Sequence, residues 1–209
     1  FKLEDLGVVK DFVGKIDESS PYFGDVIKIV CFYYWKTSDY SKILSFGGNN
    51  PTLETIKLYA EYMKNPSSDK LKKILATPID HVTLLMVSDF LKKTGTNIDA
   101  LDAKELDTIY SRALNYGETD LAKRYLARYY AVSNDTDYYE RNKNRLLYNS
   151  GKKSDAIEEL TKFVQSGKAS DATVDLLFIY LKGMGSYSKI ANLAISLSKT
   201  KGMRYYNQY

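Results

Sequence analysis

The 209-residue sequence has few of the residues that mark disulfide-linked, metal-binding or membrane-spanning proteins. One cysteine and one histidine can form neither an internal disulfide nor a cluster with metal-ligand spacing. The apolar runs extend over only a few residues, whereas a membrane-spanning helix needs about 20. Four prolines leave long stretches in which a helix can continue without interruption. We therefore expect a globular chain without a metal site or a transmembrane segment.

The sequence also lacks a large excess of positive or negative charge. Thirty basic and 26 acidic residues leave a net charge of +4, so no overall field marks a nucleic-acid or membrane binder. Cys31 lies within an apolar run, where a buried and unreactive thiol is expected. The sequence begins with Phe1 and not with methionine, so we expect an N-terminus that was processed or truncated. The localisation therefore stays open, export and lipid anchoring included.

Catalytic motifs are lacking as well. The sequence has no glycine-rich phosphate loop and no Gly-x-Ser-x-Gly turn. The one histidine, His81, follows Asp80 in an apolar helical pattern, where a packing or capping role is expected. The adjacent carboxylates Glu158 and Glu159 are expected on the outer, solvated face of a helix. The sequence therefore predicts no catalytic residue, no cofactor and no enzymatic activity.

Helical periodicity dominates what is present. Apolar residues recur at spacings of three and four, and no bounded run alternates between apolar and polar residues as a strand would. The pattern predicts helices over residues 4–16, 21–36, 40–46 and 52–64, a short one near 71–75, and one from 77–80 to about 93. Thr52 is expected to cap the fourth of these. The chain is expected to be all-α, with about twelve helices joined mostly by short loops into antiparallel hairpins.

Three glycines, Gly117, Gly151 and Gly185, stand 34 residues apart, each in a short polar turn between two helical stretches. A glycine tolerates the left-handed backbone angles that such a turn needs. Five positions after each glycine stands a small or apolar residue, and where it is alanine the small side chain lets two helix axes approach. These residues are Ala122, Ala156 and Ile190. The fixed period indicates a repeat architecture.

The three registered units, residues 103–136, 137–170 and 171–204, resemble tetratricopeptide repeats, a family of 34-residue helical hairpins. The resemblance implies an α-solenoid, in which antiparallel hairpins stack into a tetratricopeptide-like right-handed superhelix. We expect a single helical-repeat domain over residues 1–209, with irregular hairpins in 1–102 and the three repeats in 103–204.

The middle unit departs from the family pattern. Glu140, Lys143 and Asn144 occupy positions that should be apolar. In this family the first helix of each unit lines a concave groove, and the resemblance implies a set of groove residues. These are Lys104, Asp107, Ser111, Leu114, Asn115, Tyr138, Arg141, Arg145, Tyr148, Asn149, Asp175, Ile179 and Lys182.

Two arginines and two tyrosines of this set share one face of the middle unit's first helix, at spacings of three, four and seven. Arginine forks pair with carboxylates, and tyrosine rings give rigid contact area with a polar tip, as in interaction hot spots. The sequence therefore predicts a non-enzymatic scaffold or adaptor that binds another protein or peptide on its concave face. A solvated basic face without a partner is the plainer alternative.

Two further hypotheses remain. An RNA-binding α-solenoid would use the same basic, tyrosine-containing face for phosphate neutralisation and base stacking. The balanced charge and the lack of a recurring polar pair in each unit count against it. The array could also self-associate, because the sequence of residues 203–209 does not predict a polar capping helix of the kind that ends most repeat arrays.

Overall fold

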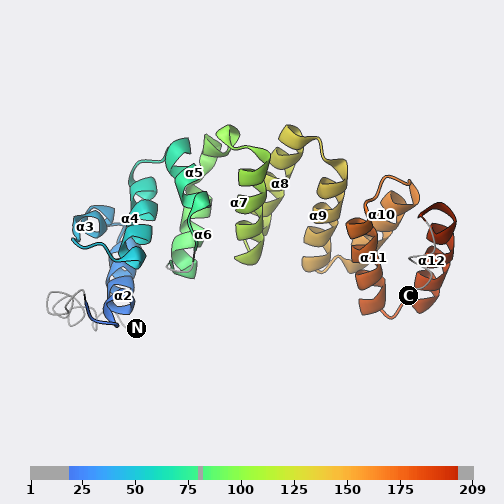
Figure 1. Cartoon of the computed structure of the whole chain (residues 1–209), viewed down its shortest axis with the longest axis horizontal. Coiled ribbons are helices and arrows are strands. Elements are labelled where there is room, and N and C mark those ends of the chain that lie inside the picture. Colours follow the sequence, from blue (N-terminus) through green and yellow to red (C-terminus); the bar gives the residue numbers. More distant parts are fainter. Residues whose placement is uncertain (1–18, 80–81, 202–209) are drawn as a thin grey trace. The chain divides into compact units, whose positions relative to one another are not determined.

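The computed structural model describes residues 19–79 and 82–201, and within these ranges the chain forms eleven α-helices, one 3-10 helix and no strand (Figure 1). The expectation of an all-α chain is confirmed for this part. The helix expected over residues 4–16, and the pair Asp80 and His81, lie outside the described residues.

The chain divides into two compact units, Phe1–Val132 and Ser133–Tyr209. The division falls close to the expected boundary between the first and second 34-residue units. Unit 1 holds α2 (Phe23–Lys36), α3 (Tyr40–Ser45), α4 (Pro51–Lys64), α5 (Ser68–Ala76), α6 (Leu84–Lys93), η2 (Gly95–Ala100), α7 (Ala103–Asn115) and α8 (Thr119–Ser133), the last ending at the boundary. Unit 2 holds α9 (Thr136–Asn149), α10 (Lys153–Gln165), α11 (Asp171–Gly183) and α12 (Tyr187–Lys201). The expectation of one domain over the whole chain stays a prediction.

Two helix starts in unit 1 differ from the expected ones. Asn50, and not Thr52, caps α4: its side chain accepts hydrogen bonds from the backbone N–H groups of Thr52 and Leu53. Pro51 takes the first helical position, where its missing N–H leaves no donor unsatisfied. The helix expected from 77–80 begins only at Leu84, capped by Thr83. Thr77 is extended because the following proline disfavours helical angles.

The core of unit 1 is built around aromatic side chains from α2, α4 and α6. Phe90 lies edge-on to both Tyr59 and Tyr62, with ring centroids 5.0 and 5.2 Å apart. Trp35 is buried, and its indole N–H donates to Asp89 at 2.9 Å. Cys31 is fully buried, as expected, and burial raises the pKa of its thiol to about 12, with the charge of Lys57 opposing the rise.

A buried arginine joins α7 to the end of α5. Arg112 is 8% exposed, and its guanidinium donates to the backbone carbonyls of Ile74, Leu75 and Thr77 at 3.1, 3.0 and 2.9 Å. It also reaches the Tyr59 hydroxyl at 3.4 Å. The last carbonyls of a helix have no partner within the helix, so this side chain supplies the donors that the C-terminus of α5 lacks.

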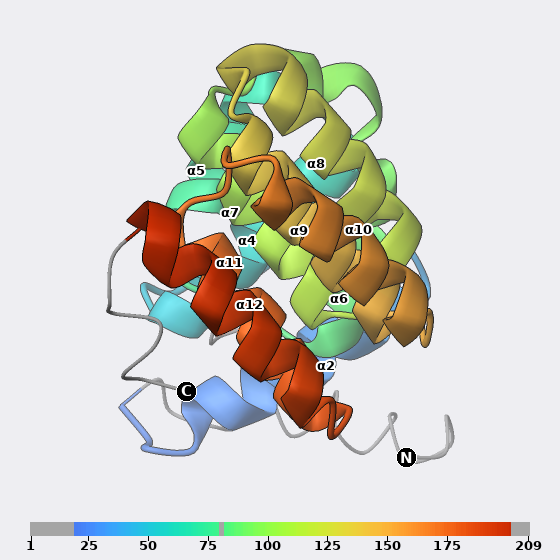
Figure 2. The ribbon, with the colours of Figure 1, turned by 90° about the vertical axis from the view of Figure 1, so that its right-hand side faces the viewer.

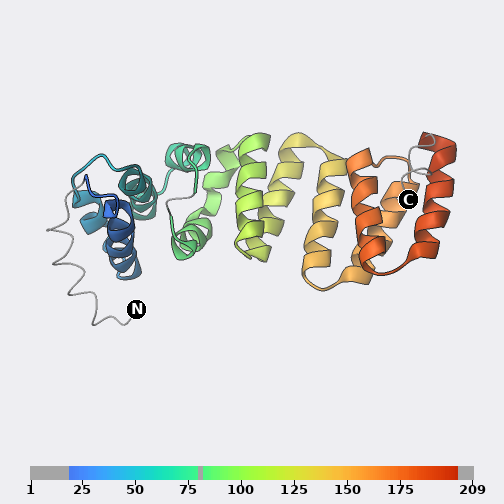
Figure 3. The same ribbon diagram turned by 60° about the horizontal axis from the view of Figure 1, so that its bottom comes forward.

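Unit 2 consists of two helical hairpins, α9–α10 and α11–α12. The helices pack in chain order, α10 against both α9 and α11, and α12 lies along α11 (Figure 2; Figure 3). Their shared core contains Leu160 from α10, Val174, Leu177 and Phe178 from α11, and Leu193 from α12. Buried residues lie on most sides of α11, so α11 is the central helix of the unit.

The three repeat glycines adopt the left-handed conformation that was expected, with φ angles of 74° at Gly117, 88° at Gly151 and 66° at Gly185. A Cβ added at Gly151 would meet no atom within 4 Å, so an alanine there is strained only in its backbone. We expect Gly151→Ala to lower the free energy of unfolding by about 1 kcal/mol, measured by urea denaturation.

Gly47 is the matched control for this substitution. Its added Cβ would also meet nothing, and its φ lies outside the left-handed region. Gly47→Ala should therefore leave the stability unchanged or raise it slightly. Equal destabilisation by the two substitutions would contradict the assignment of the Gly151 effect to backbone strain.

Candidate functional site

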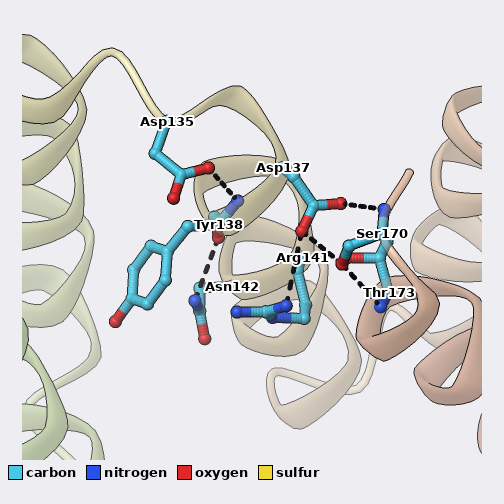
Figure 4. Close-up of polar contacts among 7 residues, drawn as sticks. All are labelled: Asp135, Asp137, Tyr138, Arg141, Asn142, Ser170 and Thr173. Atoms are coloured by element: carbon cyan, nitrogen blue, oxygen red, sulfur yellow. Dashed lines mark hydrogen bonds and ion pairs between the residues drawn. The ribbon is translucent and has the colours of Figure 1, made fainter. Parts of the chain in front are cut away.

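The first helices of the two hairpins in unit 2, α9 and α11, run parallel, with their N-terminal ends together. Asp137, in the first turn of α9, accepts hydrogen bonds from the N-cap of α11: from the Ser170 backbone N–H at 2.8 Å and from its hydroxyl at 2.6 Å (Figure 4). Asp135 caps α9 itself through the Tyr138 N–H at 2.9 Å. Carboxylates at helix N-termini are stabilising because they face the positive end of the helix dipole.

Arg141 is held within this contact. Its guanidinium pairs with Asp137 at 3.4 Å and lies 5.5 Å from the centre of the Tyr138 ring. Its side chain is 23% exposed. Two of the expected groove residues, Tyr138 and Arg141, therefore take part in contacts within unit 2, and Arg141 is not an open cation.

These contacts lower the pKa of the Asp137 carboxyl. Partial burial raises the pKa of this carboxyl, but the hydrogen bonds from Ser170 and Thr173 and the charge of Arg141 outweigh it and hold the pKa below its ordinary value. A lowered native-state pKa means that the ionised carboxylate stabilises the fold above the ordinary aspartate pKa. This stabilisation is lost as the pH falls through the lowered value.

We expect Asp137→Asn to lower the free energy of unfolding by about 1 kcal/mol at neutral pH, because it removes charge-assisted hydrogen bonds at the start of α11. The difference between wild type and variant should begin to shrink below about pH 4, the ordinary aspartate pKa, and should be lost as the pH falls through the lowered native-state pKa of Asp137. Urea denaturation of both proteins across this pH range measures it. A difference that persists unchanged in acid would contradict the contribution of the charge.

The C-terminal ends of α9 and α11 are also joined, by two tyrosines. Tyr148 and Tyr180 stack with ring centroids 3.8 Å apart and planes inclined by 8°. A Cβ at Gly183 would lie 3.3 Å from the Tyr148 hydroxyl, so the glycine allows this close approach. Burial raises the pKa of Tyr180, and a hydrogen bond and charge from Arg145 partly oppose the rise. We call Tyr148 and Tyr180 the tyrosine pair.

Three cations lie at the C-terminal ends of α9 and α11 and at the start of α10, and we call them the basic cluster: Arg145, Lys182 and Lys153. Arg145 bonds to Tyr180, and the Lys153 ammonium lies 5.3 Å from the centre of the Tyr148 ring. Lys182 precedes Gly183 at the end of α11. All three are exposed, and none forms an ion pair with any residue that the structure describes.

The polar residues that set the middle repeat apart serve helix packing. Lys143 forms ion pairs with Glu140 at 3.5 Å and with Glu159 of α10 at 2.7 Å. Asn144 is fully buried and donates to the Glu140 carbonyl at 2.9 Å. Glu159 was expected on a solvated outer face. Its side chain is 42% exposed, and it also pairs with Lys143 across from α9. Glu158 is exposed and pairs with Lys162 on its own helix.

The remaining expected groove residues are not members of the basic cluster. Asn149 is exposed at the last position of α9, and Asp175 is half-buried in the first half of α11. Five others are on α7 in unit 1, where Lys104 and Asn115 are exposed and Asp107, Ser111 and Leu114 are half-buried. The structure thus joins Arg145 and Tyr148 of the expected set through Tyr180, and places Lys182 two positions after that tyrosine.

Three residues of the site were not among the expected groove residues: Lys153, Tyr180 and Gly183. Tyr180 lies among the apolar positions of α11 and looks like any core residue in the sequence. Gly183 did leave a signal, because a second glycine two positions before Gly185 sits inside a helical pattern. A glycine within a helix often marks a close approach of another group.

One further hollow lies between α10 and α12. It has a volume of about 210 Å³ and is lined by Thr161, Gln165, Leu181, Lys189, Asn192, Leu193 and Ser196. Only one charged side chain borders it, so no set of charges converges there. Over the ranges 19–79 and 82–201, no three His, Cys, Asp or Glu side chains gather as a metal site would require, and no helix has the length and apolar character to cross a membrane.

No protein-family model matches this sequence, and no curated protein or solved structure is significantly similar to it. The resemblance to tetratricopeptide repeats therefore stays a prediction that rests on the 34-residue spacing.

Proposed function

We propose that the chain is a non-enzymatic scaffold that binds another protein or peptide, and that the face shared by α9 and α11 is its binding surface. The proposal places the helices in a tetratricopeptide-like α-solenoid, whose first helices line the concave side. The observation that carries it is the basic cluster: exposed cations without an ion-pair partner in the described structure, two of which, Arg145 and Lys153, contact the stacked tyrosine pair.

The arrangement favours binding because part of it is already ordered. Tyr148 is held between Tyr180 and Lys153, and Arg145 is bonded to Tyr180. A partner would lose less side-chain entropy on such a surface than on flexible lysines and arginines. Tyrosine and arginine are also the side chains enriched at the centres of protein interfaces.

An RNA-binding surface is less well supported by the same contacts. A base needs an open aromatic face on which to stack. Tyr180 already covers one face of the Tyr148 ring, and the Lys153 ammonium lies over the ring as well. A base would have to displace Lys153, whereas a carboxylate can approach the three cations from solvent.

Charge reversal at Arg145 is the test. Proteins captured from the native source by the wild-type chain should be lost from Arg145→Glu and from Lys182→Glu, with affinity for the identified partner reduced at least tenfold. Arg141→Glu is a poor probe because it would break the Asp137 ion pair and disturb the fold.

Lys168→Glu is the matched control, since Lys168 is exposed, carries the same charge and lies in the loop before α11. It should bind the partner as the wild type does. Equal capture by all four proteins would remove the α9–α11 face from consideration. Sedimentation over a concentration series separates partner binding from self-association, which would appear as a concentration-dependent mass.

A further inference from the structure

Negative and positive side chains on the α9–α11 face lie toward opposite ends of the two helices. Because the two helices run parallel, their N-terminal halves together carry the carboxylates Asp137, Asp171 and Asp175. Their C-terminal ends, and the start of α10, carry the basic cluster. The two ends of the face therefore attract groups of opposite charge. Among the described residues, the cations of α9 and α11 that have no ion-pair partner, Arg145 and Lys182, both lie toward the C-terminal ends.

An exposed apolar side chain stands beside the basic cluster. Ile179 is 61% exposed, although its neighbours Phe178 and Tyr180 are buried in unit 2. It lies three positions before Lys182, and residues at this spacing are neighbours on a helix surface. Cations near a helix C-terminus stabilise the helix whatever they bind. That role does not explain an exposed isoleucine among them.

We propose that the basic end of this face takes an acidic segment of a partner polypeptide, in which an aliphatic or aromatic side chain stands next to the carboxylates. This inference rests on the proposed function and names the chemistry of the partner. One carboxylate pairs with the Arg145 guanidinium, a second lies near Lys182 or Lys153, and the apolar side chain packs on Ile179. Charge complementarity selects the partner, and the apolar contact adds affinity that salt does not screen.

Short fluorescein-labelled peptides test the inference by anisotropy with the full 209-residue chain. The first peptide has a leucine flanked by glutamates in a glycine-serine background; the second replaces the glutamates with glutamines, and the third replaces the leucine with serine. We expect the first to bind best, with the second weakened about tenfold and the third about threefold. Binding of the first should weaken with added salt.

Neutral substitutions locate the contact. Arg145→Gln should weaken the first peptide about tenfold, and Lys182→Gln and Ile179→Ser about threefold each. Lys168→Gln should have no effect. Circular dichroism of each variant confirms that it is folded, and Lys182 and Ile179 are exposed enough that their replacement leaves the core intact.

Equal binding of the glutamate and glutamine peptides, or equal loss with Lys168→Gln, would overturn the inference. So would binding of a single-stranded oligouridine probe with none of the acidic peptide. The proposed function is tested separately, by the binding of the native partner, so its failure can be distinguished from these outcomes. If Arg145→Glu loses that partner while the acidic peptides do not bind, the face is a binding surface, but for a partner segment that is not acidic.

Discussion

Replacing Arg112 with methionine is expected to lower the free energy of unfolding of unit 1 by about 3 kcal/mol. The guanidinium is the donor for three backbone carbonyls at and beyond the end of α5, at 2.9 to 3.1 Å. Methionine has a similar length but no donor, so the carbonyls of Leu75 and Thr77 would lose the guanidinium, whereas the Ile74 carbonyl would keep the Thr77 N–H. Arg112→Lys should cost less, because one ammonium can satisfy some of these acceptors but not the whole fork.

Trp35 provides the measurement, because it is the only tryptophan in the sequence and lies in unit 1. The urea midpoint followed by its fluorescence should fall in the order wild type, Arg112→Lys, Arg112→Met. Arg128→Met is the control, since Arg128 is partly exposed and pairs with the exposed Asp99 at the surface of the same unit. That variant should change stability by less than about 1 kcal/mol. A similar loss of stability from both methionine variants would show that the buried hydrogen bonds of Arg112 stabilise the unit no more than a surface ion pair does.

Phe178→Ala is expected to cost about 3 to 4 kcal/mol and to disrupt the packing of unit 2. Phe178 is fully buried on the central helix α11, among side chains from α10 and α12. Removing the ring takes away apolar burial and leaves a cavity that the surrounding helices can fill only in part. The expected readout is an earlier loss of the helical circular dichroism signal in urea or on heating.

The next residue in the chain is the control for this substitution. Ile179 is on the same helix but mostly exposed, so Ile179→Ala should change stability by no more than about 0.5 kcal/mol. The pair of variants separates the effect of the core from the effect of changing an apolar residue anywhere on α11. Comparable losses from both would mean that Ile179 is covered in solution, which self-association would explain.

The candidate site was predictable in part. Spacing along one helix placed Arg145 and Tyr148 on a common face, and the repeat register added Lys182. The same spacing also grouped Arg141 with them, but Arg141 pairs with Asp137, whose other partner Ser170 is 33 residues away. Helical periodicity tells which residues share a face. It does not tell which of them find a partner on the next helix.

What the sequence determined by itself is local: the helices, most of their boundaries and the left-handed turns at Gly117, Gly151 and Gly185. These depend on apolar periodicity and on the backbone freedom of single residues, both of which can be read over a few positions. The tertiary structure decided the pairings, such as Tyr148 on Tyr180 and Arg112 at the end of α5. Such contacts join residues more than 30 positions apart, and their energies depend on burial and geometry that arise only when the helices pack.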